Sequence, residues 1–484
     1  MVFSELFFLF VFIPLFALLY MLAAYVDRTR VKGEALRHPN RMKNIVIVIF
    51  SLFFYAWGEP IYVFVMLASV LINYIAGRII DRQEKQRKSA LIVGLVCNLG
   101  VLGVFKYAGF FAETLQQLGL DIPRPSIALP IGISFYTFQS ISYLVDVYRR
   151  QSPAQKRYSD LLLYISMFPQ LVAGPIVRYQ TVADEIGNRK VSAQDFAEGT
   201  YRFFIGLGKK VIIANQLSEI STHFLASSDM SDLSTAGAWV GLLAFTFQIY
   251  YDFSGYSDMA IGIGRCLGFH FLENFNHPYC CSSITDFWRR WHISLGTFFR
   301  DYVYIPMGGN RQHQVLNLFV VWFLTGMWHG ANWNFILWGL YFGLFVTIEK
   351  YTILRIKSKA AAPLLHLYSL IVVVLGWGLF YYVDLSRLGE FVPILFGKTQ
   401  TMSDITVSNA LTDNFWLWIA AIVFSLPVRQ MLEQGMSGLL EHRSPRLYSA
   451  GQLIYRTCVV IGILTISVAL LVGATNNPFL YTRF

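Results

Sequence analysis

Two short stretches, FWRRWHISL at residues 287–295 and TGMWHGANW at residues 325–333, decide how this chain of 484 residues is interpreted. The second lies near the middle of an apolar run, 315–348, which carries His329 but no Asp, Glu, Lys or Arg. An ionisable group at membrane depth is costly to bury and is therefore a functional hypothesis by default. His329 is the first candidate for a functional side chain.

The run 315–348 is too long for one membrane helix, which needs about 20 residues, and too short for two helices with a generous loop. Gly326, Gly330 and Asn332 gather near its centre. Non-helical backbone at that depth is tolerated only where protein buries it or where it lines a wet cavity. We therefore predict a break at the centre of the run, with His329 at the wall of a cavity.

The stretch before it has the pattern of an amphipathic helix. On a helical wheel the apolar side chains of 287–299 fall on one side, and Arg289 and Arg290 lie on the other. This pattern predicts one helix lying along a membrane interface, with His292 at the rim of its apolar side. Either histidine alone could be a packing residue. Two of them so close in sequence favour a functional pair.

The composition is that of an integral membrane protein. Hydrophobic residues make up 55% of the chain and charged residues 14%, against roughly 25% charged residues in soluble domains. The basic excess of +10 is concentrated in short loops, which indicates membrane orientation and contact with anionic lipids, with no nucleic-acid partner. Five irregularly spaced cysteines imply no disulfide framework.

The expected fold is all-α, with about 11–12 membrane segments, some of them broken or re-entrant. The first segment, near 3–26, lacks the basic flank of a cleaved signal and is taken as a membrane helix. One membrane domain over 1–484, with no soluble domain and its core motifs at about 129–348, is expected. The apolar runs fall at 3–26, 44–58, 61–79, 89–111, 127–148, 161–177, 197–215, 237–264, 315–348, 364–383, 414–432 and 451–474.

Three further polar groups stand in apolar stretches. Gln139 most simply makes a hydrogen bond between helices. Asp252 and Asp258 are six residues apart, on opposite helix faces unless the chain breaks at Gly255, so each is expected to cap a helix or to pair with an arginine such as Arg265.

Several classes of chemistry find no support in the sequence. Cys280 and Cys281 with His277 lack the separated spacing of zinc ligands, so no metal site is expected. Motifs for ATP hydrolysis, serine hydrolases and zinc proteases are absent from the sequence.

The motifs FWRRWH (287–292), RDYVYIPMGGNR (300–311) and WHG (328–330) resemble those of the membrane-bound O-acyltransferase family. The resemblance covers nearly the whole chain and is to the bacterial branch that acetylates alginate or peptidoglycan. Gly296, Phe298 and Met327 stand where that branch more often has Ser, Trp and Leu, which blurs the sub-branch but leaves the chemistry alone.

The resemblance implies helices around a central tunnel, with His329 as the catalytic histidine and His292 as a second functional histidine. It also implies acetyl-CoA as the donor substrate, no permanently bound cofactor, and an extracytoplasmic SGNH-type partner protein that places the acetyl group on a polysaccharide. The alternative is a secondary transporter or flippase, which has similar broken segments. Candidate substrate-binding side chains are Gln139, Asp252, Asp258, Arg290, Trp328 and Asn332.

Loop charge predicts the topology in a bacterial inner membrane. Basic residues crowd the loops 27–43, 80–88 and 433–450, whereas 384–413 is acidic. By the positive-inside rule the basic loops are cytoplasmic and the N-terminus and 384–413 are extracytoplasmic. We expect single cysteines in 384–413 of right-side-out vesicles to react with a membrane-impermeant reagent. Labelling of 27–43 from outside would overturn this topology.

Overall fold

The computed structural model describes residues 1–29, 39–227, 229–356, 358–428, 431, 445–473 and 479–480. Within these ranges the regular structure is entirely helical, as predicted. The chain divides into two compact units, one built from 1–203 and 256–273 and the other from 204–255 and 274–480. The long helix α12 (Thr235–Cys266) contributes residues to both.

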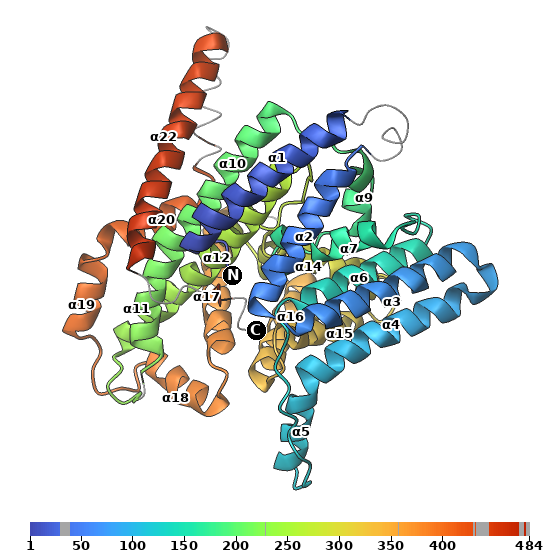
Figure 1. The fold of residues 1–484 in the computed structure, drawn as a ribbon. Coiled ribbons are helices and arrows are strands. Elements are labelled where there is room, and N and C mark those ends of the chain that lie inside the picture. The colour runs from blue at the N-terminus through green and yellow to red at the C-terminus, as the bar shows by residue number, and fades with distance from the viewer. Residues whose placement is uncertain are drawn as a thin grey trace. The chain divides into compact units, whose positions relative to one another are not determined.

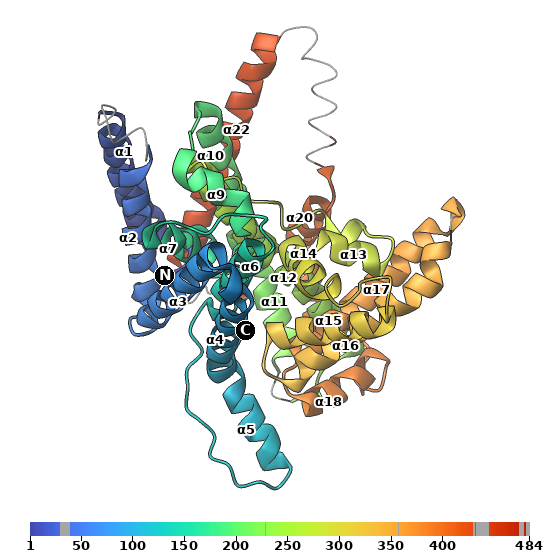
Figure 2. The same ribbon diagram turned by 90° about the vertical axis from the view of Figure 1, so that its right-hand side faces the viewer.

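The first unit contains the N-terminal helices (Figure 1). Helices α3 and α4 lie side by side in both views (Figure 2), and Asn73 and Asn98 exchange amide hydrogen bonds of 3.0 and 2.7 Å between them. Such amide pairs hold helices together in apolar surroundings. Its elements are η1 (Phe8–Phe12), α1 (Ile13–Thr29), α2 (Arg41–Gly58), α3 (Tyr62–Arg82), η3 (Glu84–Gln86), α4 (Arg87–Leu102), η4 (Gly103–Tyr107), α5 (Ala108–Gln117), α6 (Ile133–Tyr148), α7 (Tyr158–Ser166), α8 (Phe168–Leu171), α9 (Tyr179–Asn188) and most of α10 (Ala193–Gly208).

The second unit contains both candidate histidines. Its elements are η5 (Lys209–Ala214), α11 (Asn215–Leu225), the first part of α12, η6 (Pro278–Cys280), α13 (Ile284–Arg290), α14 (Ile293–Phe299), η7 (Arg300–Tyr304), α15 (Gln314–His329), α16 (Trp333–Tyr351), η8 (Ile353–Arg355), η9 (Lys359–Ala361), α17 (Ala362–Tyr381), α18 (Leu385–Leu395), α19 (Ile405–Thr412), α20 (Phe415–Ser425) and α22 (Pro445–Val472).

Seven helical stretches of the described chain are long and apolar enough to cross a membrane, or up to eight if the bent pair α19 and α20 counts as one span. Most of the other apolar runs form shorter or interrupted helices, in keeping with the predicted broken segments. The run 237–264 is the exception, because it lies within the unbroken 32-residue helix α12. The central tunnel and the sidedness of the loops stay predictions. Of the basic loops, 30–38 and 432–444 lie outside the described residues.

The predicted break in 315–348 is confirmed. Helix α15 ends at His329 and α16 begins at Trp333, and the two pack against each other as a hairpin. Glycines make this contact possible: a Cβ atom on Gly339 would collide with the carbonyl oxygen of Trp322, and one on Gly326 with that of Phe335. The backbones of α15 and α16 can therefore approach closely, as small residues allow in membrane helices.

We predict that Gly339→Ala destabilises the protein by about 1–3 kcal/mol, because overpacking a tight contact forces the helices apart. Thermal unfolding of the purified protein in detergent measures this. Gly100→Ala on α4 is the matched control, since a Cβ there meets nothing within 4 Å; it should be neutral or slightly stabilising. Equal melting temperatures for Gly339→Ala and wild type would contradict the close contact.

Candidate functional site

His292 lies at a break between two short helices. The sequence predicted one continuous amphipathic helix, and this was wrong: α13 ends at Arg290 and α14 starts at Ile293. His292 adopts φ 44° and ψ 53°, a left-handed conformation that is uncommon for residues other than glycine. Asn274 holds the turn, because its carbonyl oxygen accepts the N–H of Ile293 at 3.0 Å and its Oδ1 accepts that of Ser294 at 3.2 Å.

The other end of α13 is held by a carboxylate. Glu349 on α16 is fully buried, and its two oxygens accept the backbone N–H groups of Ile284 and Thr285 at 2.5 and 2.8 Å. Ser283 caps the same end by accepting the N–H of Asp286. An anion at a helix N-terminus satisfies amides that have no partner within the helix. Glu349 therefore holds α13, the helix that leads into His292, against α16.

His329 is the last residue of α15 and is 2% exposed. Its imidazole contacts three aromatic rings, with centroid distances of 5.0 Å to Trp328, 4.8 Å to Trp338 and 5.5 Å to Phe380. These rings come from α15, α16 and α17. After His329 the chain continues through Gly330 in extended backbone, so the imidazole is placed where the helix stops.

Trp328 lies beside both histidines. Its ring centroid is 5.6 Å from that of His292 and 5.0 Å from that of His329. His292 is 1% exposed, and its ring also contacts Phe253 of α12 at 4.6 Å. The structure thus brings His292 and His329 to the same indole ring. The wet cavity expected at His329 stays a prediction.

The electrostatics of His292 favour a neutral ring. This residue lies outside the helices that are long enough to cross a membrane. Burial disfavours the charged imidazolium and lowers the pKa of His292 to about 3. At neutral pH the ring is uncharged, and one of its nitrogens carries a lone pair. A neutral imidazole among aromatic rings can accept a hydrogen bond or a proton.

Two predicted binding residues make local hydrogen bonds. Arg290 donates from Nε to Asp286 at 3.0 Å on its own helix. Asn332 is exposed at the start of α16, where its backbone oxygen accepts the N–H of Ile336. The buried amide of this region is that of Asn334, whose Nδ2 donates to the carbonyl oxygen of Phe380 at 3.3 Å. That bond ties α16 to α17 behind His329.

The carboxylates of α12 are ion-paired. Asp252 accepts from Lys210 Nζ at 2.6 Å and from the backbone N–H of Leu480 at 2.8 Å, and both charged side chains are nearly inaccessible. Asp258 pairs with Arg202 at 2.8 Å. Helix α12 runs unbroken through Gly255. The predicted arginine partner is thus confirmed for Asp258, whereas the partner of Asp252 is a lysine.

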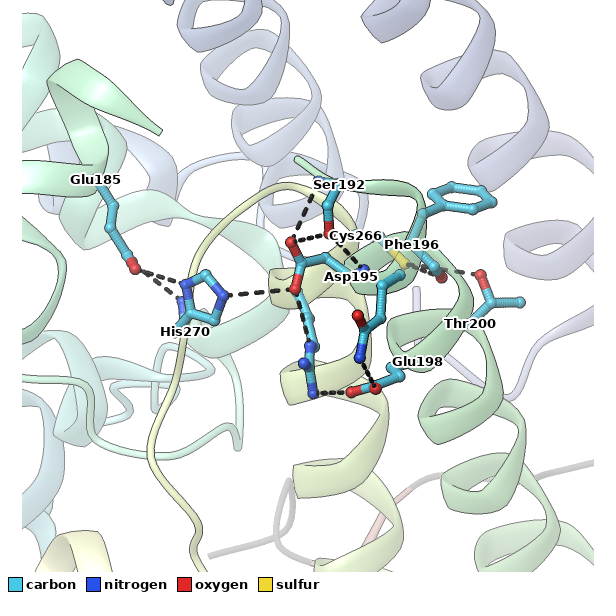
Figure 3. A network of polar contacts seen from close by, with 10 residues as sticks. Glu185, Ser192, Asp195, Phe196, Glu198, Thr200, Cys266 and His270 are labelled. Carbon is cyan, nitrogen blue, oxygen red and sulfur yellow. Dashed lines mark hydrogen bonds and ion pairs between the residues drawn. The ribbon is translucent and has the colours of Figure 1, made fainter. Parts of the chain in front are cut away.

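Arg265, the partner suggested from sequence, belongs to a separate network in the first unit. Figure 3 shows Glu185, Asp195, Glu198 and His270 of this network. It reaches Glu198 at 2.5 Å and Asp195 at 3.4 Å. His270 continues the network, with Nδ1 at 2.7 Å from Glu185 and Nε2 at 3.8 Å from Asp195. These contacts tie α9, α10 and the end of α12 together.

Gln139 on α6 is fully buried in the first unit. The predicted helix-to-helix hydrogen bond is not seen: within the described chain neither its amide nitrogen nor its amide oxygen has a hydrogen-bond partner. Its neighbour Ser142 donates to the backbone oxygen of Gln139 instead.

The site contains residues that sequence reasoning missed. Asn274, Phe253, Glu349 and Phe380 come from segments 18 to 57 positions away from the histidine that each of them supports. Glu349 carried a weak signal, since a lone acid at the end of an apolar run needs a partner. Nothing in the sequence around Asn274, Phe253 and Phe380 indicated that these residues support the histidines.

Comparison with known proteins places the chain among acyltransferases. Residues 152–389 match the model of the membrane-bound O-acyltransferase family. The chain is 38% identical to the probable alginate O-acetylase AlgI of Azotobacter vinelandii, with all of both chains covered. It is 37% identical to the peptidoglycan O-acetyltransferase of Helicobacter pylori, over 63% of this chain and 64% of that one. It is 29% identical to the teichoic acid D-alanyltransferase of Bacillus subtilis, over 45% of this chain and 58% of that one.

Proposed function

Because this chain belongs to the membrane-bound O-acyltransferase family, we propose that it passes an acetyl group from cytoplasmic acetyl-CoA across the bacterial inner membrane for O-acetylation of an extracytoplasmic polysaccharide. Family membership favours acyl chemistry over the transporter alternative. Similarity along the full length of an alginate O-acetylase supports an alginate-like exopolysaccharide as the final acceptor. Peptidoglycan is the second candidate, because the chain is also similar to the peptidoglycan O-acetyltransferase of Helicobacter pylori.

The observation that carries this proposal is the pair of buried imidazoles beside Trp328. His329 and His292 are 2% and 1% exposed and contact the same indole ring. A histidine within hydrogen-bond reach of a reacting hydroxyl is the commonest general base in enzymes. The two buried imidazoles are therefore this chain's candidates for taking the hydroxyl proton.

The proposed step is acyl transfer to a hydroxyl. The acceptor oxygen attacks the thioester carbonyl carbon while His329 takes the hydroxyl proton. A C–O bond forms, the C–S bond breaks, and the proton passes to the leaving thiolate, which gives an acetyl ester and free coenzyme A. General-base help of this kind is typically worth about 10²–10⁴-fold in rate.

Purified protein supplied with acetyl-CoA and an acceptor or partner protein should release free coenzyme A, measured with a thiol reagent. The control omits the acceptor. Movement of substrate through proteoliposomes without consumption of thioester would refute the enzyme assignment and leave the transporter.

We predict that His329→Ala lowers acetyl transfer by at least about 10²-fold, because the proton acceptor is lost. The rate of coenzyme A release and the level of inserted protein measure this. His366→Ala is the matched control. That half-buried histidine lies 2.7 Å through Nδ1 from the carbonyl oxygen of Cys281, and the variant should retain activity. Full activity of His329→Ala at normal expression would make His329 a packing residue.

The proposed acceptor is a hydroxyl on an SGNH-type partner protein, at the extracytoplasmic mouth of the proposed tunnel. The N-terminus of this chain is proposed to lie on the same side of the membrane. The outward segments 112–126 and 384–413 offer no long aromatic platform for a glycan chain. We therefore expect acetyl groups to pass from acetyl-CoA to polysaccharide only when the partner is present. Acetyl-CoA with a radiolabelled acetyl group, and counting of the label in the polysaccharide, measures this. Direct acetylation of purified polysaccharide by this protein alone would refute the relay.

A further inference from the structure

Asn274 is buried in the loop that follows α12, with 1% of its surface exposed. Its side-chain oxygen Oδ1 lies 3.2 Å from the backbone nitrogen of Ser294, 2.9 Å from the Ser294 hydroxyl and 3.2 Å from Nδ1 of His292. One amide atom thus meets three polar atoms of the turn that carries the imidazole.

These contacts determine which atoms carry hydrogen. A backbone N–H can only donate, so the Asn274 atom facing the nitrogen of Ser294 must be the oxygen and not the NH₂ group. That oxygen also faces Nδ1 of His292. Two acceptors facing each other gain nothing. The Ser294 hydroxyl lies 3.4 Å from Nδ1 but donates its hydrogen to Asn274 Oδ1 at the shorter distance of 2.9 Å, so Nδ1 carries a hydrogen. In a neutral imidazole the other nitrogen, Nε2, then carries the lone pair.

We infer that Asn274 is a positioning residue that fixes His292 as the Nδ1–H tautomer, so that its Nε2 works on the proton-accepting side of acyl transfer. This assignment rests on the proposed function. The substrate group that faces Nε2 must then be a hydrogen-bond donor, such as a hydroxyl or an amide N–H. It also rules out a role for neutral His292 as the Nε2–H donor that stabilises a carbonyl oxygen.

An amide is the appropriate partner for this task. A carboxylate at position 274 would accept the same hydrogen bonds but would also stabilise the charged imidazolium. Phe253 and Trp328, which contact the His292 ring, carry no charge. The neutral amide of Asn274 therefore orients the ring without favouring its protonation.

The tautomer is measured directly by nitrogen-15 NMR of histidine-labelled protein in lipid, with the His292 signals assigned by their loss in His292→Gln. We expect the wild type to show a protonated Nδ1 and an unprotonated Nε2 at neutral pH, and Asn274→Ala to lose this single state. A protonated Nε2 in the wild type would overturn the inference. This readout does not need activity, so it stands apart from a failure of the proposed function, which a lack of thioester consumption by the wild type would reveal.

Activity separates positioning from packing. We expect Asn274→Ala to lower coenzyme A release by about 10–100-fold, the range found for outer partners of metal-bound histidines. Asn274→Asp keeps the acceptor oxygen and should recover part of the rate at alkaline pH, while the acid limb of its pH profile moves to higher pH than in the wild type. An unshifted acid limb in an active, folded Asn274→Asp protein would refute the role.

Asn317→Ala is the matched control. Asn317 is equally buried in the same unit and donates to the backbone oxygens of Gly309 and Gln312 at 3.0 and 2.7 Å. Its removal should lower the melting temperature without changing the nitrogen-15 signature of His292 or the acid limb. If Asn317→Ala moved these two readouts as Asn274→Ala does, the effect at Asn274 would be one of general packing.

Discussion

Backbone polar groups freed where a helix breaks must find partners, and the candidate site depends on how this chain meets that requirement. Both imidazoles are at breaks, His292 between α13 and α14 and His329 at the end of α15. In apolar surroundings each unsatisfied group costs several kcal/mol. The side chain and backbone of Asn274 meet the need at the first break, and Glu349 meets it at the start of α13. The site thus depends on two buried polar residues as much as on its histidines.

Packing places the second imidazole. Gly326 and Gly339 let α15 and α16 approach closely, and this contact sets where α15 stops and where Trp338 faces His329. The rings of Trp328, Trp338 and Phe380 contact the imidazole and restrict its rotation. Rigid surroundings of this kind are what general-base chemistry requires, because a misplaced base loses its reach to the proton.

Periodicity and composition predicted the helices well, because apolar runs of membrane length have few alternatives. The break after His329 was predictable from its local glycines and asparagines. The break at His292 was not, since the amphipathic pattern continues through it and the cause, Asn274, lies 18 positions earlier in the chain. For the same reason the partners of Asp252 and Asp258 were not predictable: which cation faces a buried acid is decided by tertiary packing.

The ion pair of Asp252 and Lys210 has a consequence for the order of events during synthesis. The second oxygen of Asp252 is satisfied by the N–H of Leu480, 228 positions further along the chain. At about 5–20 residues per second, the ribosome takes about 10–50 seconds to add that stretch. Throughout this interval a nascent carboxylate destined for burial has its lysine but not its last donor. The second unit therefore reaches its final hydrogen-bonded state only after nearly all of its helices have been made.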